Sequence, residues 1–404
     1  MSRIVFMGPQ GHGHITPMLG LAAELVARGH DVTFAAPGAY EDGVTASGAH
    51  FHLVRSRWES LDAGEIPQMH GREMVRAMRL LLDETKSMVE QLADLPPPEL
   101  VVHDGTLAWW GRILAHRWAV PSVETWPNLV GNKHWNMSSY VRLNPFSPTF
   151  LLTMLRIGRY IRAEGISDVG AFMQGRLANA RIVTLPRSFQ PRFETFTEHD
   201  FIGPIIADRS FQGTWEPSSP EAPVVLVSLG TAYNNRPEFF RMVSDSARGR
   251  PWHVVMAVGE QVRLGDLGEL PSNVEVHQRV PQVAVLEHAH AFVTHAGMGS
   301  TLEALALKVP TVAVAQMAEQ RANADRIRDL GLGEALDPLG LTPDALWSAI
   351  DRVAHDPQIA RRLQDMSDEI EAAGGATAGA DVVETVIGRT RRDRGSDEKG
   401  EGER

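Results

Sequence analysis

The chain has 404 residues, which is more than one hydrophobic core usually supports, so two domains are expected. Its formal charge of -11 argues against nucleic-acid binding, and the absence of cysteine excludes disulfides, thiolate nucleophiles and cysteine-based zinc sites. No apolar run reaches the roughly 18 residues that span a bilayer, and the chain opens on a strand-like segment rather than a leader peptide. These features predict a cytoplasmic protein that does not interact with a membrane.

The first half of the sequence alternates strand-like and helix-like segments. Residues 4–7 form an apolar strand, a glycine-rich turn follows over 8–13, and Pro17 suits the first turn of the next helix. A second strand over 31–35 completes a strand–helix–strand unit, which implies a parallel sheet. The same patterns predict helices over 74–95 and 107–118, strands over 100–104, 122–124 and 181–185, and an irregular stretch over 126–175.

A second series of strands begins after a segment rich in Pro, Ser and Gly, over residues 206–222. Its strands are expected over 224–229, 253–258, 274–277, 291–295 and 311–315. Two α/β series joined by a linker suggest two nucleotide-fold domains with a site in the cleft between them. The expected divisions are a domain over 1–207, a linker over 208–222, a domain over 223–388 and a disordered charged tail over 389–404.

Two common nucleotide-binding patterns are missing. The turn over residues 8–13 does not have the G-x-G-x-x-G spacing, and the second strand ends without an acidic residue for a ribose hydroxyl. The chain also lacks the P-loop pattern. A dinucleotide-dependent dehydrogenase and a P-loop NTPase are therefore weak alternatives.

The segment HAGMGST over residues 295–301 predicts a diphosphate site. A strand ends at His295, small residues follow, and Ser300 and Thr301 open a helix. A helix N-terminus offers unpaired N–H groups with a partial positive charge, and glycine lets the backbone approach an anion. The alternative is a tight turn with a serine cap.

The segments RVPQ (279–282), HAGMGSTLE (295–303), EQ (319–320) and GHGHITP (11–17) resemble the signatures of the UDP-glycosyltransferase superfamily, glycosyltransferase family 1. The likeness is strongest to actinobacterial macrolide glycosyltransferases and runs to about residue 385. It implies the α/β GT-B fold, in which two Rossmann-like domains with parallel sheets face each other across a cleft. The domain over 1–207 would then bind the acceptor and that over 223–388 the nucleotide sugar.

The resemblance also implies roles for individual residues, with some departures from the family pattern. Arg279 stands where many members have a tryptophan that stacks on uracil, and a guanidinium plane can stack on a base too. Gly299 replaces an asparagine of plant members, and Glu319 replaces an aspartate that binds the donor sugar. The expected donor-binding residues are Ser228, Gly230, Thr231, Arg279, Val280, Gln282, His295, Gly297, Gly299, Ser300, Thr301, Glu303, Glu319 and Gln320.

His14 and Asp104 are the candidates for proton transfer, because each lies just past a strand of the first sheet. A neutral imidazole accepts a proton near pH 7, and a carboxylate on its other nitrogen fixes the tautomer. The resemblance places the general base and its orienting acid at these positions. His12 competes with His14 for this role, a metal site on the two histidines lacks a third ligand, and His103 is expected to be structural. Without the resemblance, a solvated or helix-capping role is the more common one for such residues.

The sequence lacks the Asp-x-Asp triplet with which many sugar transferases hold a metal. We therefore expect a metal-independent enzyme without a cofactor, in which His295 and the helix start at 299–301 stabilise the departing diphosphate. One base and direct attack imply inversion at the anomeric carbon. The expected partners are a UDP-sugar and a hydrophobic small molecule, in a monomer or homodimer.

Methionine and tryptophan are frequent in the first half, and both suit a bulky hydrophobic acceptor such as a macrolide. The candidates for acceptor contact are Met69, Met78, Trp110, Trp126, Trp135 and Met137, although any single one is more simply a core residue. Two further functions stay open. One is a TDP-deoxysugar transferase, and the other is a non-catalytic UDP-sugar binder that would not need His14 and Asp104.

Overall fold

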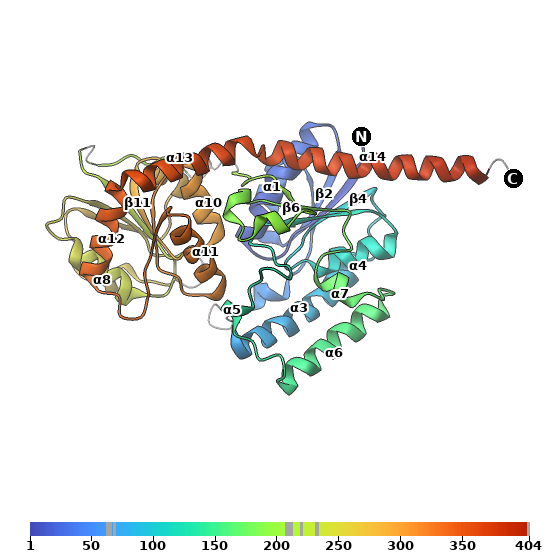
Figure 1. Ribbon diagram of the computed structural model, residues 1–404, viewed down its shortest axis with the longest axis horizontal. Helices are drawn as coiled ribbons and strands as arrows, with labels where there is room; N and C mark the ends of the chain where they lie inside the picture. Colours follow the sequence, from blue (N-terminus) through green and yellow to red (C-terminus); the bar gives the residue numbers. More distant parts are fainter. Residues whose placement is uncertain (62–66, 68–69, 207–212, 219–220, 231–233, 402–404) are drawn as a thin grey trace. The chain divides into compact units, whose positions relative to one another are not determined.

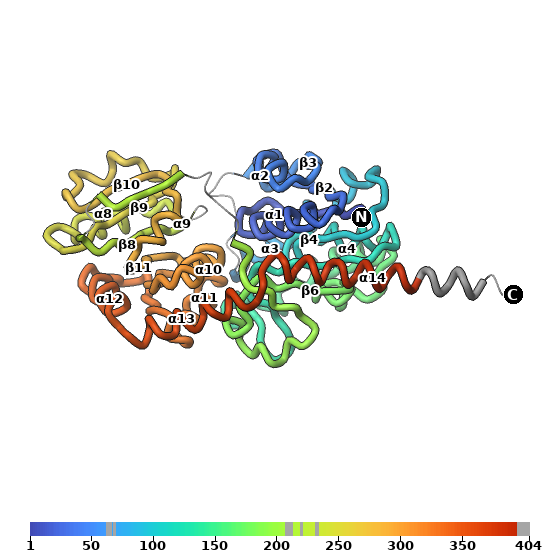
Figure 2. Tube along the Cα trace, turned by 90° about the horizontal axis from the view of Figure 1, so that it is seen from above, coloured from blue at the N-terminus to red at the C-terminus, as the bar shows by residue number. Residues whose placement is uncertain are grey.

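The computed structural model describes the chain except residues 62–66, 68–69, 207–212, 219–220, 231–233 and 402–404, and it describes only the backbone of 394–401. The chain divides into two compact units, shown in Figures 1 and 2. Unit 1 comprises Met1–Ala207 together with Ala373–Arg404, and unit 2 comprises Asp208–Ala372.

Unit 1 is built on a parallel sheet with strand order β3-β2-β1-β4-β5-β6-β7. Its strands are β1 (Arg3–Met7), β2 (Asp31–Ala36), β3 (His50–Leu53), β4 (Leu100–Asp104), β5 (Ser122–Trp126), β6 (Ala180–Val183) and β7 (Asp200–Phe201). Its helices are α1 (His12–Ala27), α2 (Glu41–Ala46), α3 (Gly71–Gln91), α4 (Trp109–Trp118), α5 (Ser138–Val141), α6 (Pro148–Ala163), α7 (Val169–Met173) and α14 (Gly375–Glu401). Short 3₁₀ helices lie at Gly38–Tyr40, Arg57–Ser60, Arg187–Phe189 and Phe193–Thr195.

The alternation of side chains along β1 explains the layers of unit 1. Ile4 and Phe6 face a core that contains residues of α1 and α14, whereas Val5 and Met7 face a second core that contains residues of α3, α4 and α6. Both sides are apolar, as expected for a parallel strand covered by helices on both faces. Figure 1 shows α1 and α14 on one side of this sheet and α3, α4 and α6 on the other.

Unit 2 repeats the scheme with strand order β10-β9-β8-β11-β12-β13, and all described strand pairs are parallel. Its strands are β8 (Val224–Ser228), β9 (His253–Ala257), β10 (Val274–His277), β11 (Ala289–Thr294), β12 (Thr311–Ala313) and β13 (Gly333–Ala335). Its helices are α8 (Pro237–Ala247), α9 (Gln282–Leu286), α10 (Met298–Ala306), α11 (Ala318–Asp329), α12 (Pro343–His355) and α13 (Pro357–Ala372), with a 3₁₀ turn at Leu264–Leu267.

The strand order of each sheet reverses once, between β1 and β4 in unit 1 and between β8 and β11 in unit 2. At such a switch point two neighbouring strands send their connections in opposite directions, which leaves a crevice at their carboxyl ends. Ligands of open α/β sheets bind there. The two sheets are the doubly wound parallel α/β sheets that the sequence predicts.

The division of the chain differs from the sequence-based prediction at its C-terminal end. Instead of belonging to the second domain up to residue 388, with a disordered tail after it, α14 contacts α1 and β6 of unit 1 (Figures 1 and 2). Ala380, Val383 and Ile387 are buried in the core beside α1, because their helical spacing places them on one face. Arg391, within the expected tail, donates hydrogen bonds to Ser2 and Glu99.

Two other elements differ from the prediction. The stretch over 126–175 is not irregular throughout, because it contains α6, which begins at Pro148. The hydroxyl of Ser147, the N-cap of this helix, accepts the Phe150 N–H. Helix α1 begins at His12, so Pro17 lies inside it rather than in its first turn. His14 is therefore a residue of the first helical turn.

Candidate active site

His14 and Asp104 form a hydrogen-bonded pair at the switch point of the first sheet. His14 follows β1, Asp104 ends β4, and these strands are neighbours in the sheet. The Nδ1 atom of His14 lies 2.8 Å from Oδ2 of Asp104. Because a carboxylate only accepts, the ring must donate from Nδ1, and Nε2 becomes the nitrogen able to accept a proton. The His14 side chain is 17% exposed and that of Asp104 is fully buried.

Asp104 is held as an anion by three donors. Its Oδ1 accepts the backbone N–H groups of Thr106 at 2.9 Å and Leu107 at 2.6 Å, and its Oδ2 accepts from His14. Burial by itself would raise the pKa of this carboxyl group, but the His14 ring and the two amides outweigh it and lower the pKa below its ordinary value. Asp104 therefore stays ionised and can stabilise an imidazolium on His14.

The turn before α1 orients His14. Gly11 has φ of 153°, which favours glycine, and its N–H donates to the hydroxyl of Tyr40 at 2.9 Å. The ring of His12 packs edge-on to Tyr40, with centroids 5.1 Å apart. The His14 ring is thus paired with Asp104, whereas the His12 ring lies against Tyr40. His103 is fully buried, and burial lowers its pKa.

The switch point of the second sheet carries the HAGMGST turn. Ser228 ends β8 and is paired in register with Thr294 at the end of β11, so His295 follows directly beside it. Burial lowers the pKa of His295 to about 4, although a hydrogen bond to the Ser228 backbone opposes this shift. Gly230 has φ of 79°, and a Cβ there would lie 2.5 Å from the His295 ring. This glycine therefore lets the loop after β8 pass close to the imidazole.

Helix α10 begins within this segment at Met298, with Gly297 as its N-cap, so it starts two residues before Ser300. A Cβ on Gly299 in the first helical turn would meet open space. Nε2 of Gln282 donates to the Ser300 hydroxyl at 3.0 Å and to the Glu303 carboxylate at 2.6 Å, which joins three of the predicted residues into one polar cluster. The exposed backbone N–H groups of a helix start and this cluster together suit an anion with an adjacent polyol.

The remaining predicted donor residues are more scattered. Oε1 of Gln320 accepts the N–H groups of Gln316 and Met317 and so caps α11. Arg279 is exposed and pairs with Glu260 at 2.9 Å. A cavity of about 240 Å³ in unit 2 is lined by nine residues, among them Leu229, Val314, Gln316 and Leu341. The other predicted positions comprise Val280 and Glu319, both partly buried, Thr301, which is buried, and Thr231, which lies outside the described residues.

The candidates for acceptor contact differ in how far their side chains are buried. Trp110 is 2% exposed and packs in the core with α3 and α6, so its assignment to the acceptor is corrected to a packing role. Met78 is partly buried against the same core. Trp126, Trp135 and Met137 are partly exposed, and Met69 lies outside the described residues.

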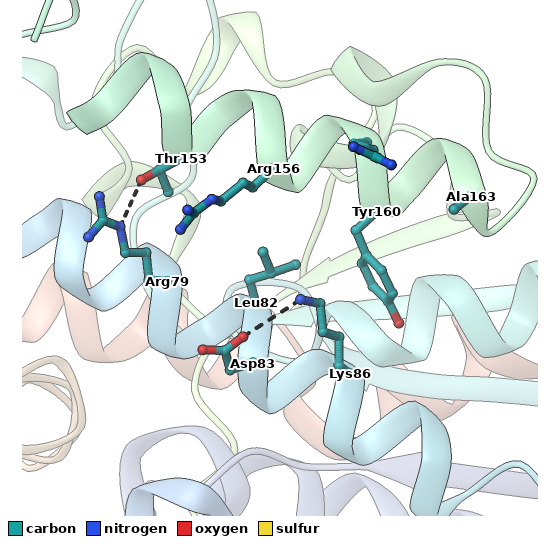
Figure 3. Close-up of a pocket in the computed structure, with 9 residues that line it drawn as sticks. Arg79, Leu82, Asp83, Lys86, Thr153, Arg156, Tyr160 and Ala163 are labelled. Carbon is teal, nitrogen blue, oxygen red and sulfur yellow. Dashed lines mark hydrogen bonds and ion pairs between the residues drawn. The ribbon is translucent and has the colours of Figure 1, made fainter. Parts of the chain in front are cut away.

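A groove of about 500 Å³ lies between α3 and α6 of unit 1 (Figure 3). It is lined by Arg79, Leu82, Asp83, Lys86, Thr153, Arg156, Arg159, Tyr160 and Ala163. Figure 3 shows Arg79 directed at Thr153 and Lys86 at Asp83. The groove contains neither His14 nor Asp104 and none of the predicted site residues, so its size does not make it the reaction site.

Several residues that shape the two sites belong to no pattern that the sequence analysis could have recognised. Tyr40 supports the turn before His14, and the amide of Asn234 donates to the carbonyl of Gly230 at 2.7 Å. The amide of Asn323 donates to the carbonyl of Ala296 at 2.9 Å and supports its left-handed backbone, with φ of 61°. Over the described ranges, His, Asp and Glu form no group of three or more placed to hold a metal ion. A search of the same ranges found no helix suited to spanning a membrane.

Two family models match parts of the chain. Residues 247–387 match the C-terminal domain of erythromycin biosynthesis protein CIII-like proteins, and residues 13–157 match a glycosyl transferase 4-like domain. The two matches lie in the two α/β series that the sequence predicts.

The relatives match over nearly the whole chain. Demethyllactenocin mycarosyltransferase of Streptomyces fradiae is 35% identical, over 96% of this chain and 87% of its own. Oleandomycin glycosyltransferase of Streptomyces antibioticus is 34% identical, over 96% and 91%. NDP-glycosyltransferase YjiC of Bacillus licheniformis is 35% identical, over 93% and 95%.

Solved structures of glycosyltransferases are also similar to this chain over nearly its whole length. The calicheamicin glycosyltransferase CalG4 superposes with a TM-score of 0.84 at 34% identity, over 96% of this chain and 99% of its own. The glycosyltransferase of kitacinnamycin superposes with a TM-score of 0.85 at 32% identity, over 95% and 98%. The chain therefore belongs to the family of these antibiotic glycosyltransferases and is a glycosyltransferase of the GT-B fold.

Proposed function

We propose that this enzyme transfers a hexose, glucose, from a UDP-sugar to a hydroxyl group of a bulky hydrophobic acceptor such as a macrolide. The acceptor hydroxyl attacks the anomeric carbon while Nε2 of His14 takes its proton. The bond between the sugar and the diphosphate breaks, and UDP leaves. A single displacement inverts the anomeric centre.

The observation that carries the proposal is the 2.8 Å contact between His14 and the buried Asp104. A buried carboxylate bonded to Nδ1 keeps the proton on that nitrogen and stabilises the imidazolium that forms on attack. Three donors keep Asp104 ionised, so it remains able to do so. General-base assistance of this kind is worth roughly 10²–10⁴-fold in rate.

Unit 2 supplies the groups that suit a departing diphosphate. The start of α10 offers backbone N–H groups, and the buried Nδ1 of His295 and Oγ1 of Thr301 have no hydrogen-bond partner in the described part of the chain. Glu303 and Gln282 lie next to this helix start as a polar pair suited to ribose hydroxyls. We propose that these groups replace a metal ion in stabilising the leaving group.

The acceptor class rests on the relatives and on the partly exposed aromatic residues of unit 1. Relatives of 34% and 35% identity are named for oleandomycin and demethyllactenocin. Trp126 and Trp135 are partly exposed and supply flat apolar contact area. A bulky natural product fits these features better than a small sugar does.

His14→Ala tests the base. Transfer of glucose from UDP-glucose to a panel of macrolides and phenolics is measured by the mass gain of one hexose. We expect kcat to fall roughly 10²–10⁴-fold, with the UDP affinity measured by calorimetry unchanged. His12→Ala is the matched control, since His12 lies in the same turn but packs edge-on to Tyr40, and it should retain activity. A His14→Ala enzyme with wild-type turnover would refute the assignment.

A TDP-deoxysugar is the alternative donor, because one relative is named for the transfer of a mycarosyl group. Another, at 25% identity, is named a UDP-glucosyltransferase. Comparing kcat/KM for UDP-glucose and for TDP-deoxysugars with one acceptor decides between them. A preference for the TDP-sugar would overturn the donor assignment and leave the role of His14 intact.

A further inference from the structure

Arg112 of α4 and Glu124 of β5 form a buried ion pair in unit 1. Nε of Arg112 lies 2.6 Å from Oε1 of Glu124. The two residues are 4% and 0% exposed. Removing both charges from water costs about as much as their attraction returns, so a buried pair is not explained by stability alone.

Each partner of this pair also holds a part of the site. Nη2 of Arg112 donates to the carbonyl of Gly105, the residue directly after Asp104, at 2.6 Å. Oε2 of Glu124 accepts the indole N–H of Trp126 at 3.1 Å. The Arg112 guanidinium carbon lies 5.9 Å from the centroid of the Trp126 ring. One ion pair thus connects the backbone next to Asp104 with a partly exposed aromatic ring.

Glycine at two positions lets these groups approach one another. A Cβ at Gly105 would collide with the indole of Trp126, so the ring lies directly against the backbone that follows Asp104. A Cβ at Gly175 would collide with the Glu124 carboxylate. The indole therefore has a defined place against the backbone that follows Asp104, and its N–H has a fixed acceptor.

We infer that Arg112 and Glu124 are positioning residues, which hold the Trp126 indole as a rigid apolar wall for the acceptor beside His14. This inference rests on the proposed function, since it assigns the acceptor to this side of unit 1. An indole that is fixed in advance loses little conformational freedom when a flat or bulky apolar acceptor packs on it. Because Glu124 and Arg112 are themselves buried, we assign them a role that acts through Trp126.

Two variants test this arrangement. Glu124→Gln changes the acceptor of the indole N–H, and Trp126→Phe removes the N–H itself. A glutamine cannot accept from both Arg112 and Trp126, because one side of its amide is a donor. Phenylalanine keeps an apolar ring but loses the N–H. We expect each variant to raise the acceptor KM about tenfold while the donor KM stays within about twofold of wild type.

A double-mutant cycle separates positioning from general support of the fold. If Glu124 acts through Trp126, the acceptor KM of the double variant equals that of the single variant with the higher KM. The two increases in KM do not multiply. Independent, multiplying effects would overturn the inference, and so would an unchanged acceptor KM in Trp126→Phe. If Glu124→Gln fails to fold, Arg112→Met/Glu124→Leu replaces it, because that variant leaves no unpaired buried charge. Normal melting with a raised acceptor KM supports positioning, and a wild-type KM refutes it.

A second readout needs no turnover and so stands apart from the proposed function. In a proton–nitrogen NMR spectrum, the indole N–H of Trp126 is the signal that disappears in Trp126→Phe. It should be protected from exchange in the wild-type enzyme and should shift and exchange faster in Glu124→Gln. An unmoved signal overturns the inference. A wild-type enzyme that glycosylates no hydrophobic acceptor refutes the proposed function instead.

Discussion

Replacing Asp104 by asparagine is the sharpest perturbation of the proposed site, because it preserves size and removes one charge. In the native protein, Oδ1 accepts the N–H groups of Thr106 and Leu107, and Oδ2 accepts from Nδ1 of His14. Asparagine has a single oxygen, and two backbone amides hold it on the Oδ1 side. Its NH₂ group must then face His14, which forces the ring proton onto Nε2 and leaves that nitrogen unable to act as a base.

The expected effect on rate is large and that on stability is modest. Loss of the competent tautomer removes general-base catalysis, so kcat should fall about 10³-fold, within the usual range of 10²–10⁴. Both backbone hydrogen bonds survive, so the free energy of unfolding should fall only by one charge-assisted hydrogen bond, about 1–3 kcal/mol at neutral pH.

The stability difference has a defined pH dependence. The pKa of Asp104 is lowered in the folded protein, so its carboxylate stabilises the fold above the unfolded pKa of about 3.9. That contribution disappears as the pH falls through the lower, folded-state pKa. Denaturant unfolding of the wild-type and Asp104→Asn enzymes should therefore give curves that converge in acid and separate toward neutral pH.

The assay measures kcat for hexose transfer by mass spectrometry together with UDP binding by calorimetry. UDP binding should be unchanged, since the donor candidates belong to unit 2. Asp94→Asn, at an exposed position of unit 1, is the matched control and should have wild-type kcat. An Asp104→Asn enzyme that folds, binds UDP and retains kcat within about threefold of wild type would show that the carboxylate does not set the tautomer.

Three further predictions concern unit 2 and the metal. The folded-state pKa of His295, about 4, lies below its unfolded value of about 6.5, so stability is lost as the pH falls from 6.5 to 4, by up to about 3 kcal/mol. His295→Gln should flatten that part of the pH–stability curve, and an unchanged slope contradicts burial of a neutral ring. Gly299→Ala should fold normally but bind UDP at least tenfold more weakly, because its methyl group occupies open space at the start of α10. Gly230→Ala should instead lower the melting temperature, because a Cβ there meets the His295 ring. Excess EDTA should leave the transfer rate unchanged, and a rate restored only by added Mg²⁺ or Mn²⁺ would show that the diphosphate needs a metal.

Local sequence patterns were enough to predict much of the fold. Apolar strands, glycine turns and amphipathic helices act over a few residues, so the alternation of β1, α1 and β2 could be read directly. The candidates His14 and Asp104 followed from their places just after or at the end of a strand. Both sheets are parallel, and that of unit 1 is covered by helices on two faces, as that alternation implies.

Other features could not be read from local patterns. Trp110 is the same residue type as the partly exposed Trp126 and Trp135, but its place on α4 directs it into the core. The predicted domain boundary missed the return of α14 to unit 1, because the apolar face of Val383 and Ile387 matches a surface more than 350 residues earlier in the chain. The Arg112–Glu124 pair gave no sequence signal, since its members lie on different elements and no motif links them.

By itself, the sequence determined the class of chemistry. It carries the residue types that proton transfer and diphosphate binding need, each beside a strand end or a helix start. Only the tertiary structure decided which of them meet. His14 and Asp104 are 90 residues apart, and they lie 2.8 Å apart because the strand order places β1 beside β4. Strand order depends on how whole helices pack against the sheet. This packing joins residues that are far apart in the sequence, so a short segment cannot reveal it.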